Sequence, residues 1–168
     1  MKNRYILLAT MSAWACAGQG DTDRVSFPGD YVRLLRQQGE TLFNERSGVT
    51  TVYVNEVAAS AAKSRTLPFP EGAMIVMEFA KPVKNAAGEP MRDERGALLR
   101  GDIEHVDVMK RGPVLDAGDP SRAGHWSFAS YGADGKTLVA PGEAVKCAAC
   151  HSQGAADRDF VFRNRPWS

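Results

Sequence analysis

Hydrophobic and polar residues alternate along four stretches of this 168-residue chain. Strict alternation is the pattern of a β-strand with one face buried and one face more polar. In the second stretch it places Met77 and Phe79 on one face and Glu78 on the other. The four predicted strands cover residues 49–54, 73–80, 101–111 and 125–131.

Other stretches have the pattern of helices or loops. Residues 28–38 carry apolar side chains at helical spacing and are followed by Gly39, so we expect a helix there. Asn55 precedes an alanine-rich segment and can cap a helix that runs through Ser64. The polar stretch 84–99 contains glycine and proline and predicts a hairpin loop or an extended excursion.

These elements together predict an α+β fold, mainly an antiparallel β-sheet with flanking helices. A purely helical bundle is disfavoured by the number of alternating stretches. The length suits one domain, which we place at residues 18–168. At its end, residues 157–165 are expected to be extended, with Phe160 and Phe162 on one face.

The first residues have the pattern of an export signal. Lys2 and Arg4 precede an apolar run that ends among small residues, so we expect a signal peptide at residues 1–17. The run is too short to span a bilayer comfortably. The mature protein is therefore expected to be periplasmic or otherwise exported. It is soluble if cleavage is ordinary, and lipid-anchored if Cys16 is acylated as in a lipoprotein.

Charge adds little to this picture. The chain has 21 Lys and Arg against 20 Asp and Glu, which gives a net charge of +1. A balance so close to neutral gives no argument for nucleic acid or an anionic membrane as a partner.

The chemistry is concentrated in one motif, Cys147-Ala148-Ala149-Cys150-His151. Two cysteines separated by two residues and followed by histidine form the attachment pattern of a c-type haem. The thiols of Cys147 and Cys150 can both reach the vinyl groups on one haem edge. His151 then lies under the iron as an axial ligand. The motif predicts one covalently bound haem c, which is attached outside the cytoplasm and so agrees with the export signal.

Three other interpretations of the two cysteines have less support from the sequence. A structural zinc site needs four ligands, and His105 and His125 are the other histidines available, without a second cysteine pair. A thioredoxin-type motif belongs to a βαβ unit, which the pattern does not contain. Two cysteines this close do not form a disulfide framework.

The second axial position decides the class of haem protein. A methionine or a second histidine there favours electron transfer, whereas an open position favours binding or activating a small molecule. His105, His125 and the methionines in the strands are candidates, but such residues are more often part of the core or surface. We therefore expect an iron that is five-coordinate or carries water.

Four blocks extend over most of the chain after Thr50. They are TVYVNEVA (51–58), FPEGAMIVMEF (69–79), HWSFASY (125–131) and CAACHSQGAADRDFVF (147–162). These four blocks, in this order, resemble those of the cytochrome P-460 family.

The resemblance implies a periplasmic, mainly antiparallel β-fold with flanking helices, in many members a homodimer. It also implies one of two functional types. Cytochromes P-460 proper oxidise hydroxylamine and carry a lysine joined covalently to the haem ring. The relatives called cytochrome c′-beta lack that link, have a crowded apolar distal face, and bind nitric oxide or carbon monoxide.

The sequence departs from the first type at the cross-link. Alignment of the FPEGAMIVMEF block puts Met77, which has no amine, at the position of the linked lysine. Lys81, Lys84 and Lys110 are the nearby alternatives. With methionine in that position, Met77 and Phe79 would share a strand face and cap the iron.

A carboxylate near the distal pocket could accept protons from a nitrogen substrate. Glu143, just before the haem motif, is the distal-pocket candidate. Glu78 should point away from Met77 on strand alternation.

Three hypotheses follow. The first is a haem oxidoreductase that acts on hydroxylamine or nitric oxide, with a redox partner protein to exchange electrons. The second is a binder of nitric oxide or carbon monoxide without turnover. The third, which the open iron site makes least favoured, is a plain electron carrier.

Overall fold

The computed structural model describes residues 25–37, 48–113, 119–136 and 143–162. At its centre is a six-stranded sheet in the order β1-β2-β3-β4-β6-β5, in which every neighbouring pair is antiparallel. The strands are β1 (Leu35–Gln37), β2 (Val49–Val54), β3 (Met74–Pro82), β4 (Arg100–Arg111), β5 (Arg122–Ala123) and β6 (Trp126–Gly132). Among the described residues two α-helices accompany them, so the predicted α+β class with a mainly antiparallel sheet is confirmed.

The helices are α1 (Glu56–Ser64) and α2 (Glu143–Ala155). Short 3-10 turns occur at Tyr31–Arg33 and Ala156–Arg158. In the described part of the chain, no helix is long and apolar enough to cross a membrane. The expected export signal at residues 1–17 lies outside the described residues.

The predicted strands agree with β2, β3, β4 and β6 to within two residues at each end. The helix predicted over residues 28–38 is wrong. Within the described residues 28–37, the only helical turn is the 3-10 turn at Tyr31–Arg33, and Leu35 then pairs with Val54 as the start of β1. The physical reason is that the open edge of β2 offers backbone hydrogen bonds, which outweigh a weak local preference for helix.

Asn55 caps α1 as predicted. Its Oδ1 accepts from the Ala58 N–H at 3.0 Å and from the Met74 N–H at 3.1 Å, and its Nδ2 donates to the Gly72 carbonyl at 2.8 Å. One side chain therefore satisfies an unpaired amide at the start of the helix and also fastens the helix to the start of β3.

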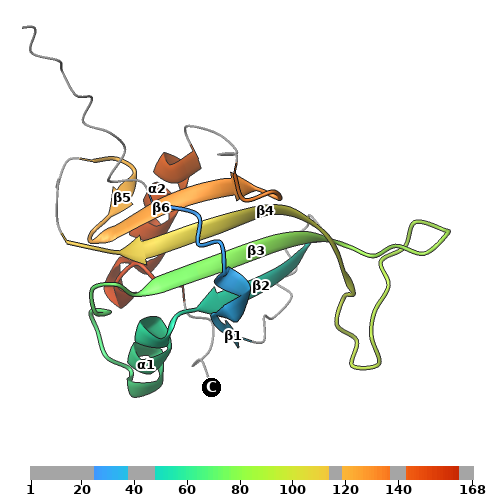
Figure 1. Cartoon of the computed structure of the whole chain (residues 1–168), viewed down its shortest axis with the longest axis horizontal. Coiled ribbons are helices and arrows are strands. Elements are labelled where there is room, and N and C mark those ends of the chain that lie inside the picture. The colour runs from blue at the N-terminus through green and yellow to red at the C-terminus, as the bar shows by residue number, and fades with distance from the viewer. Residues whose placement is uncertain (1–24, 38–47, 114–118, 137–142, 163–168) are drawn as a thin grey trace, which may run out of the picture.

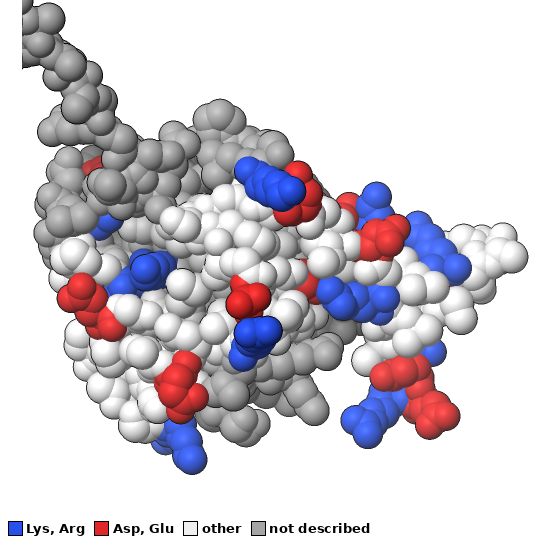
Figure 2. All heavy atoms as spheres, viewed as in Figure 1, with Lys and Arg blue, Asp and Glu red and all other residues white. Residues whose placement is uncertain are grey.

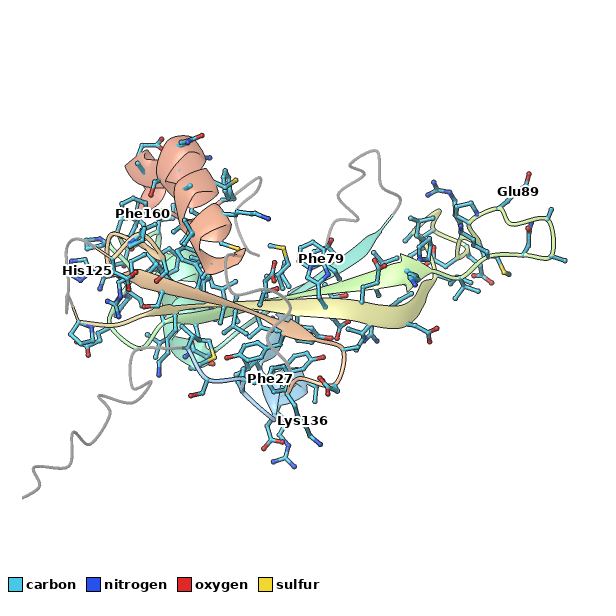
Figure 3. The ribbon with its side chains drawn as sticks, turned by 90° about the horizontal axis from the view of Figure 1, so that it is seen from above. Phe27, Phe79, Glu89, His125, Lys136 and Phe160 are labelled. Carbon is cyan, nitrogen blue, oxygen red and sulfur yellow. The ribbon has the colours of Figure 1, made fainter. Side chains whose placement is uncertain are left out.

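The two faces of the sheet bury different clusters. Helix α2 lies over one face, and the segment that contains Phe27 lies under the other (Figure 3). The α2 face packs Val54, Ile75, Met109 and Phe128 together with α1. The opposite cluster comprises Val25, Tyr31, Tyr53, Val76, Val106, Val108, Ala129 and Tyr131.

Residues 84–99 project from the body as an arm between β3 and β4 (Figure 1). Asn85 and Asp93 each use a side-chain oxygen to accept two backbone N–H groups, and each closes a tight turn. The excursion predicted from the polar, glycine-containing sequence is confirmed. Positive and negative side chains are interspersed over the face seen in Figure 2.

Candidate functional site

The Cys-x-x-Cys-His motif lies within α2, which packs across β6 and β5. Ala148 is 1 % exposed against the core, whereas Cys147 is half-buried and Cys150 is exposed, and no disulfide joins these two cysteines. Positions 147, 150 and 151 are three and four residues apart, so they share one side of the helix. The helix thus presents a half-buried thiol, an exposed thiol and a histidine together.

The His151 ring is held in one orientation. Its Nδ1 lies 2.6 Å from the carbonyl oxygen of Phe160. Its ring centroid is 4.9 Å from that of Phe128 and 4.8 Å from that of Phe162. Because a carbonyl can only accept, the proton is on Nδ1, and Nε2 keeps the lone pair with which a metal is bound.

Burial lowers the pKa of His151 below its usual value, and this effect outweighs the Phe160 carbonyl and the negative charge of Asp107, which raise it. The imidazole is therefore neutral at neutral pH, as ligation requires.

Two glycines leave room for the rings of Phe162, which contacts the His151 ring, and Phe160, whose carbonyl contacts His151. A Cβ on Gly154 would lie 2.7 Å from the Phe162 ring, and one on Gly124 would lie 2.3 Å from the Phe160 ring. Neither glycine can gain a methyl group without displacing an aromatic side chain. Sequence reasoning missed both glycines as part of the site. Their aromatic partners lie 8 positions away for Gly154 and 36 positions away for Gly124, so no local pattern identifies them.

The sheet beneath α2 continues the site away from His151. Strand pairing sets Met77 opposite Asp107, and Phe79 opposite His105. Asp107 in turn lies opposite Ser130, two residues along β6 from Phe128. Each step of two residues is about 7 Å along a strand. From His151 and Phe128, the face therefore runs to Met77 and Asp107, and then to Phe79 and His105.

The side chains of this face are partly exposed to solvent, although they lie on the two inner strands β3 and β4. Strands β3 and β4 lie inside the sheet, and on the opposite face Val76, Val106 and Val108 are at most 1 % exposed. On the α2 face, Met77, Phe79, His105 and Asp107 all remain partly exposed. A flat apolar group that stands against α2 would cover them.

His105 and Phe79 form one unit on this face. Their rings are stacked, with centroids 4.3 Å apart and planes 14° apart. Phe79 points to the same side of the sheet as α2 (Figure 3). His105 Nε2 lies 3.9 Å from Asp107 Oδ2, which is close enough for an ion pair when the histidine is protonated. The sequence pattern named Met77, Phe79 and His105, but it missed Asp107 because alternation does not reveal which strands are neighbours.

Other predicted residues lie elsewhere. Lys110 lines a cavity of about 740 Å³ with Val25 and Met74 on the opposite face, so as a cross-link alternative it does not face Met77. Lys81 is 68 % exposed and lies 3.9 Å from Glu104. Glu143 begins α2 one helical turn before Cys147, and only its backbone is described.

Glu78 faces away from Met77, as alternation predicted. It is fully buried on the opposite face, where Tyr31 donates to its Oε2 at 2.8 Å and Arg100 Nη2 lies 2.6 Å from Oε1. Burial and Glu78 together raise the pKa of Tyr31 to about 12. Glu78 therefore belongs to the structural core of the molecule and is separated from the α2 site by the sheet.

The donor set fits a haem better than a bare metal. Among the described residues, no three His, Cys, Asp or Glu side chains gather as a metal site. A structural zinc ion needs four such ligands. A half-buried thiol, an exposed thiol and a neutral histidine at this spacing could instead hold a haem c beside the partly exposed face of the sheet.

Comparison with known proteins gives one family. The family model described as Cytochrome P460 matches residues 28–163, which include the whole sheet and α2. A search of curated proteins finds no match to the chain.

Proposed function

Because the chain belongs to the cytochrome P460 family and is a haem-binding cytochrome, we propose that it carries one haem c, bound through Cys147 and Cys150, with His151 as the axial ligand. The main support for this proposal is the 2.6 Å contact between His151 Nδ1 and the Phe160 carbonyl oxygen. It fixes the tautomer and orients Nε2, which is the usual arrangement for a metal-bound histidine.

We further propose that the second axial position is open. When bound, the haem supplies a redox-active iron with that position available to a small molecule. The described residues along the face beyond His151 include Met77, Phe79, His105 and Asp107. Phe79 is fixed by its stacking on His105, and His105 is directed toward Asp107. Phenylalanine has no atom that can bind iron, and the contact with Asp107 does not favour His105 as a sixth ligand.

The ligand that fits this site best is a small nitrogen species, hydroxylamine or nitric oxide. Oxidation of hydroxylamine releases protons with its electrons, so an oxidising site needs proton acceptors close to the substrate. Asp107 and His105, which are 30 % and 35 % exposed, lie on the α2 face and can take protons from the substrate to solvent. Glu143, one turn before Cys147, is a third candidate.

The second candidate function is binding of nitric oxide or carbon monoxide without turnover. Met77 and Phe79 favour it, because they make part of the same face apolar and Met77 offers no amine for a haem cross-link. In this case Phe79, held in place by His105, would act as a steric cap.

The setting proposed for this chemistry is outside the cytoplasm. The signal pattern at residues 1–17 and the cofactor type support export, either as a soluble periplasmic protein or lipid-anchored at Cys16. A redox partner protein and a homodimeric state remain part of the proposal.

The first experiment is an absorption spectrum of the purified protein in the ferric, ferrous and carbon monoxide-treated ferrous states. A c-type spectrum that responds to carbon monoxide supports an open, attached haem. Cys147→Ser with Cys150→Ser should abolish covalent haem, while Ser152→Ala, at an exposed position on the same helix, should retain it. Covalent haem in the double variant would contradict the attachment site.

Turnover separates the two candidates. Haem-dependent oxidation of hydroxylamine with an artificial electron acceptor supports the enzyme. Asp107→Asn should then lower kcat at least several-fold while carbon monoxide still binds. Asp102→Asn, at an exposed site on the same strand, is the matched control. Gas binding without any turnover supports the second candidate.

A further inference from the structure

The turn that follows α2 has an unusual backbone. Asp159 and Phe160 adopt φ values of 51° and 63° in succession. This left-handed region is unfavourable for residues other than glycine, since Cβ approaches the backbone carbonyl. Two such residues in a row persist only where their surroundings hold them, and such sites are often functional.

The side chain of Asp159 supplies that support. Its Oδ2 accepts from the Phe69 N–H at 2.8 Å and from Arg111 Nε at 3.3 Å. The side chains of Asp159 and Arg111 are each 10 % exposed, so the ion pair is largely shielded from water. One carboxylate thus joins the turn after α2 to the segment before β3 and to the end of β4.

The turn carries the carbonyl that orients His151. The Phe160 N–H donates to the Ala155 carbonyl at 2.7 Å, and the Phe160 oxygen lies 2.6 Å from His151 Nδ1. The backbone direction at Phe160 therefore determines where this oxygen points. Figure 3 shows Phe160 beside α2.

We propose that Asp159, held by Arg111, is a positioning residue for the axial histidine. It keeps Asp159 and Phe160 left-handed, which aims the Phe160 carbonyl at Nδ1. A carbonyl that accepts from Nδ1 makes Nε2 a stronger donor to iron, and stronger donation stabilises the oxidised iron. The Arg111–Asp159 pair therefore lowers the reduction potential of the haem from a distance, without touching the iron or the ligand site. This inference rests on the proposed attachment of haem to α2.

The test compares haem-loaded variants by two readouts besides activity. One is the reduction potential from a spectroelectrochemical titration. The other is the iron–histidine stretching frequency of the ferrous protein in resonance Raman. Asp159→Ala should raise the potential and lower the frequency. Asp159→Asn, which keeps an acceptor for Phe69 but loses the charge attraction to Arg111, should shift both in the same direction by less.

Two further variants make the result decisive. Asp157→Asn, two residues away in an exposed pair with Arg158, should leave both readouts at their wild-type values. Asp159→Glu keeps the charge, so its reduction potential should lie closer to the wild-type value than that of Asp159→Ala. If Asp159→Ala fails to take up haem, the reduction potentials and stretching frequencies of Asp159→Asn and Asp159→Glu provide the test.

Wild-type potential and frequency in a loaded Asp159→Asn protein, or equal shifts in Asp157→Asn, would overturn the inference. Failure of the proposed function looks different, since wild-type protein would then carry no covalent haem at all.

Discussion

Gly124 offers the sharpest test of how the His151 side of the site is packed. Its φ is +57°, and a Cβ built there would lie 2.3 Å from Cε2 of the Phe160 ring and 3.0 Å from Cζ. Gly124→Ala therefore meets two separate penalties, a left-handed alanine and a steric overlap with an aromatic ring.

The magnitudes follow from these two terms. A left-handed alanine in place of glycine costs about 1 kcal/mol, and forcing an extra carbon into a packed site costs about 1–3 kcal/mol. We expect Gly124→Ala to lower the free energy of unfolding by about 2–4 kcal/mol in total. For a domain of this size, that corresponds to a Tm lower by about 4–16 °C.

A matched control separates the terms. Gly88 has a φ of +82°, and a Cβ there would meet nothing within 4 Å. Gly88→Ala should thus cost only the conformational term, about 1 kcal/mol. Urea denaturation of both variants measures the difference. Equal losses of stability in the two variants would refute the argument that Phe160 occupies the space beside Gly124.

Three other predictions can be checked with standard methods. Asn55→Ala removes the acceptor for the Ala58 and Met74 N–H groups and the donor to the Gly72 carbonyl. Chemical denaturation should therefore show a free energy of unfolding lower by about 1–3 kcal/mol. A decrease under about 0.5 kcal/mol would count against the cap. Because the pKa of Tyr31 is raised from 10.0 to about 12, the folded state holds the phenol proton more tightly, and stability present below pH 10 should be lost as pH rises toward 12. In Tyr31→Phe that additional decline should be absent, and an identical alkaline profile would contradict the contact with Glu78. Met77→Lys places an amine on the α2 face opposite Asp107, so a red-shifted ferrous Soret band is expected if Met77 holds the cross-link position; an unchanged band would show that it does not.

The sequence by itself determined most of the secondary structure and the chemical centre. Alternation located β2, β3, β4 and β6, because a half-buried strand repeats every two residues whatever its partners are. Asn55 marked the start of α1, since a cap is formed with residues only three positions away. The cysteine and histidine spacing defined the candidate haem site for the same reason, as these residues are adjacent on one helical turn.

Tertiary structure decided what depends on residues far apart in the chain. The pattern of residues 28–38 suits a helix, yet Leu35–Gln37 became β1 because the edge of β2 was available for pairing. Residues 157–165 were expected to be extended, but within the described part of that segment, 157–162, Asp159 and Phe160 turn left-handed. Residues 163–165 lie outside the described residues. The Asp159 carboxylate there binds the Phe69 N–H and Arg111, which lie 90 and 48 positions away and which a local pattern does not reveal.

Asp107 is part of the site for a related reason, namely the pairing of two strands. It lies beside Met77 only through the register of β3 with β4. A local repeat fixes which face a residue takes, whereas hydrogen bonding between distant segments fixes its neighbours, and only the folded sheet contains that second kind of information.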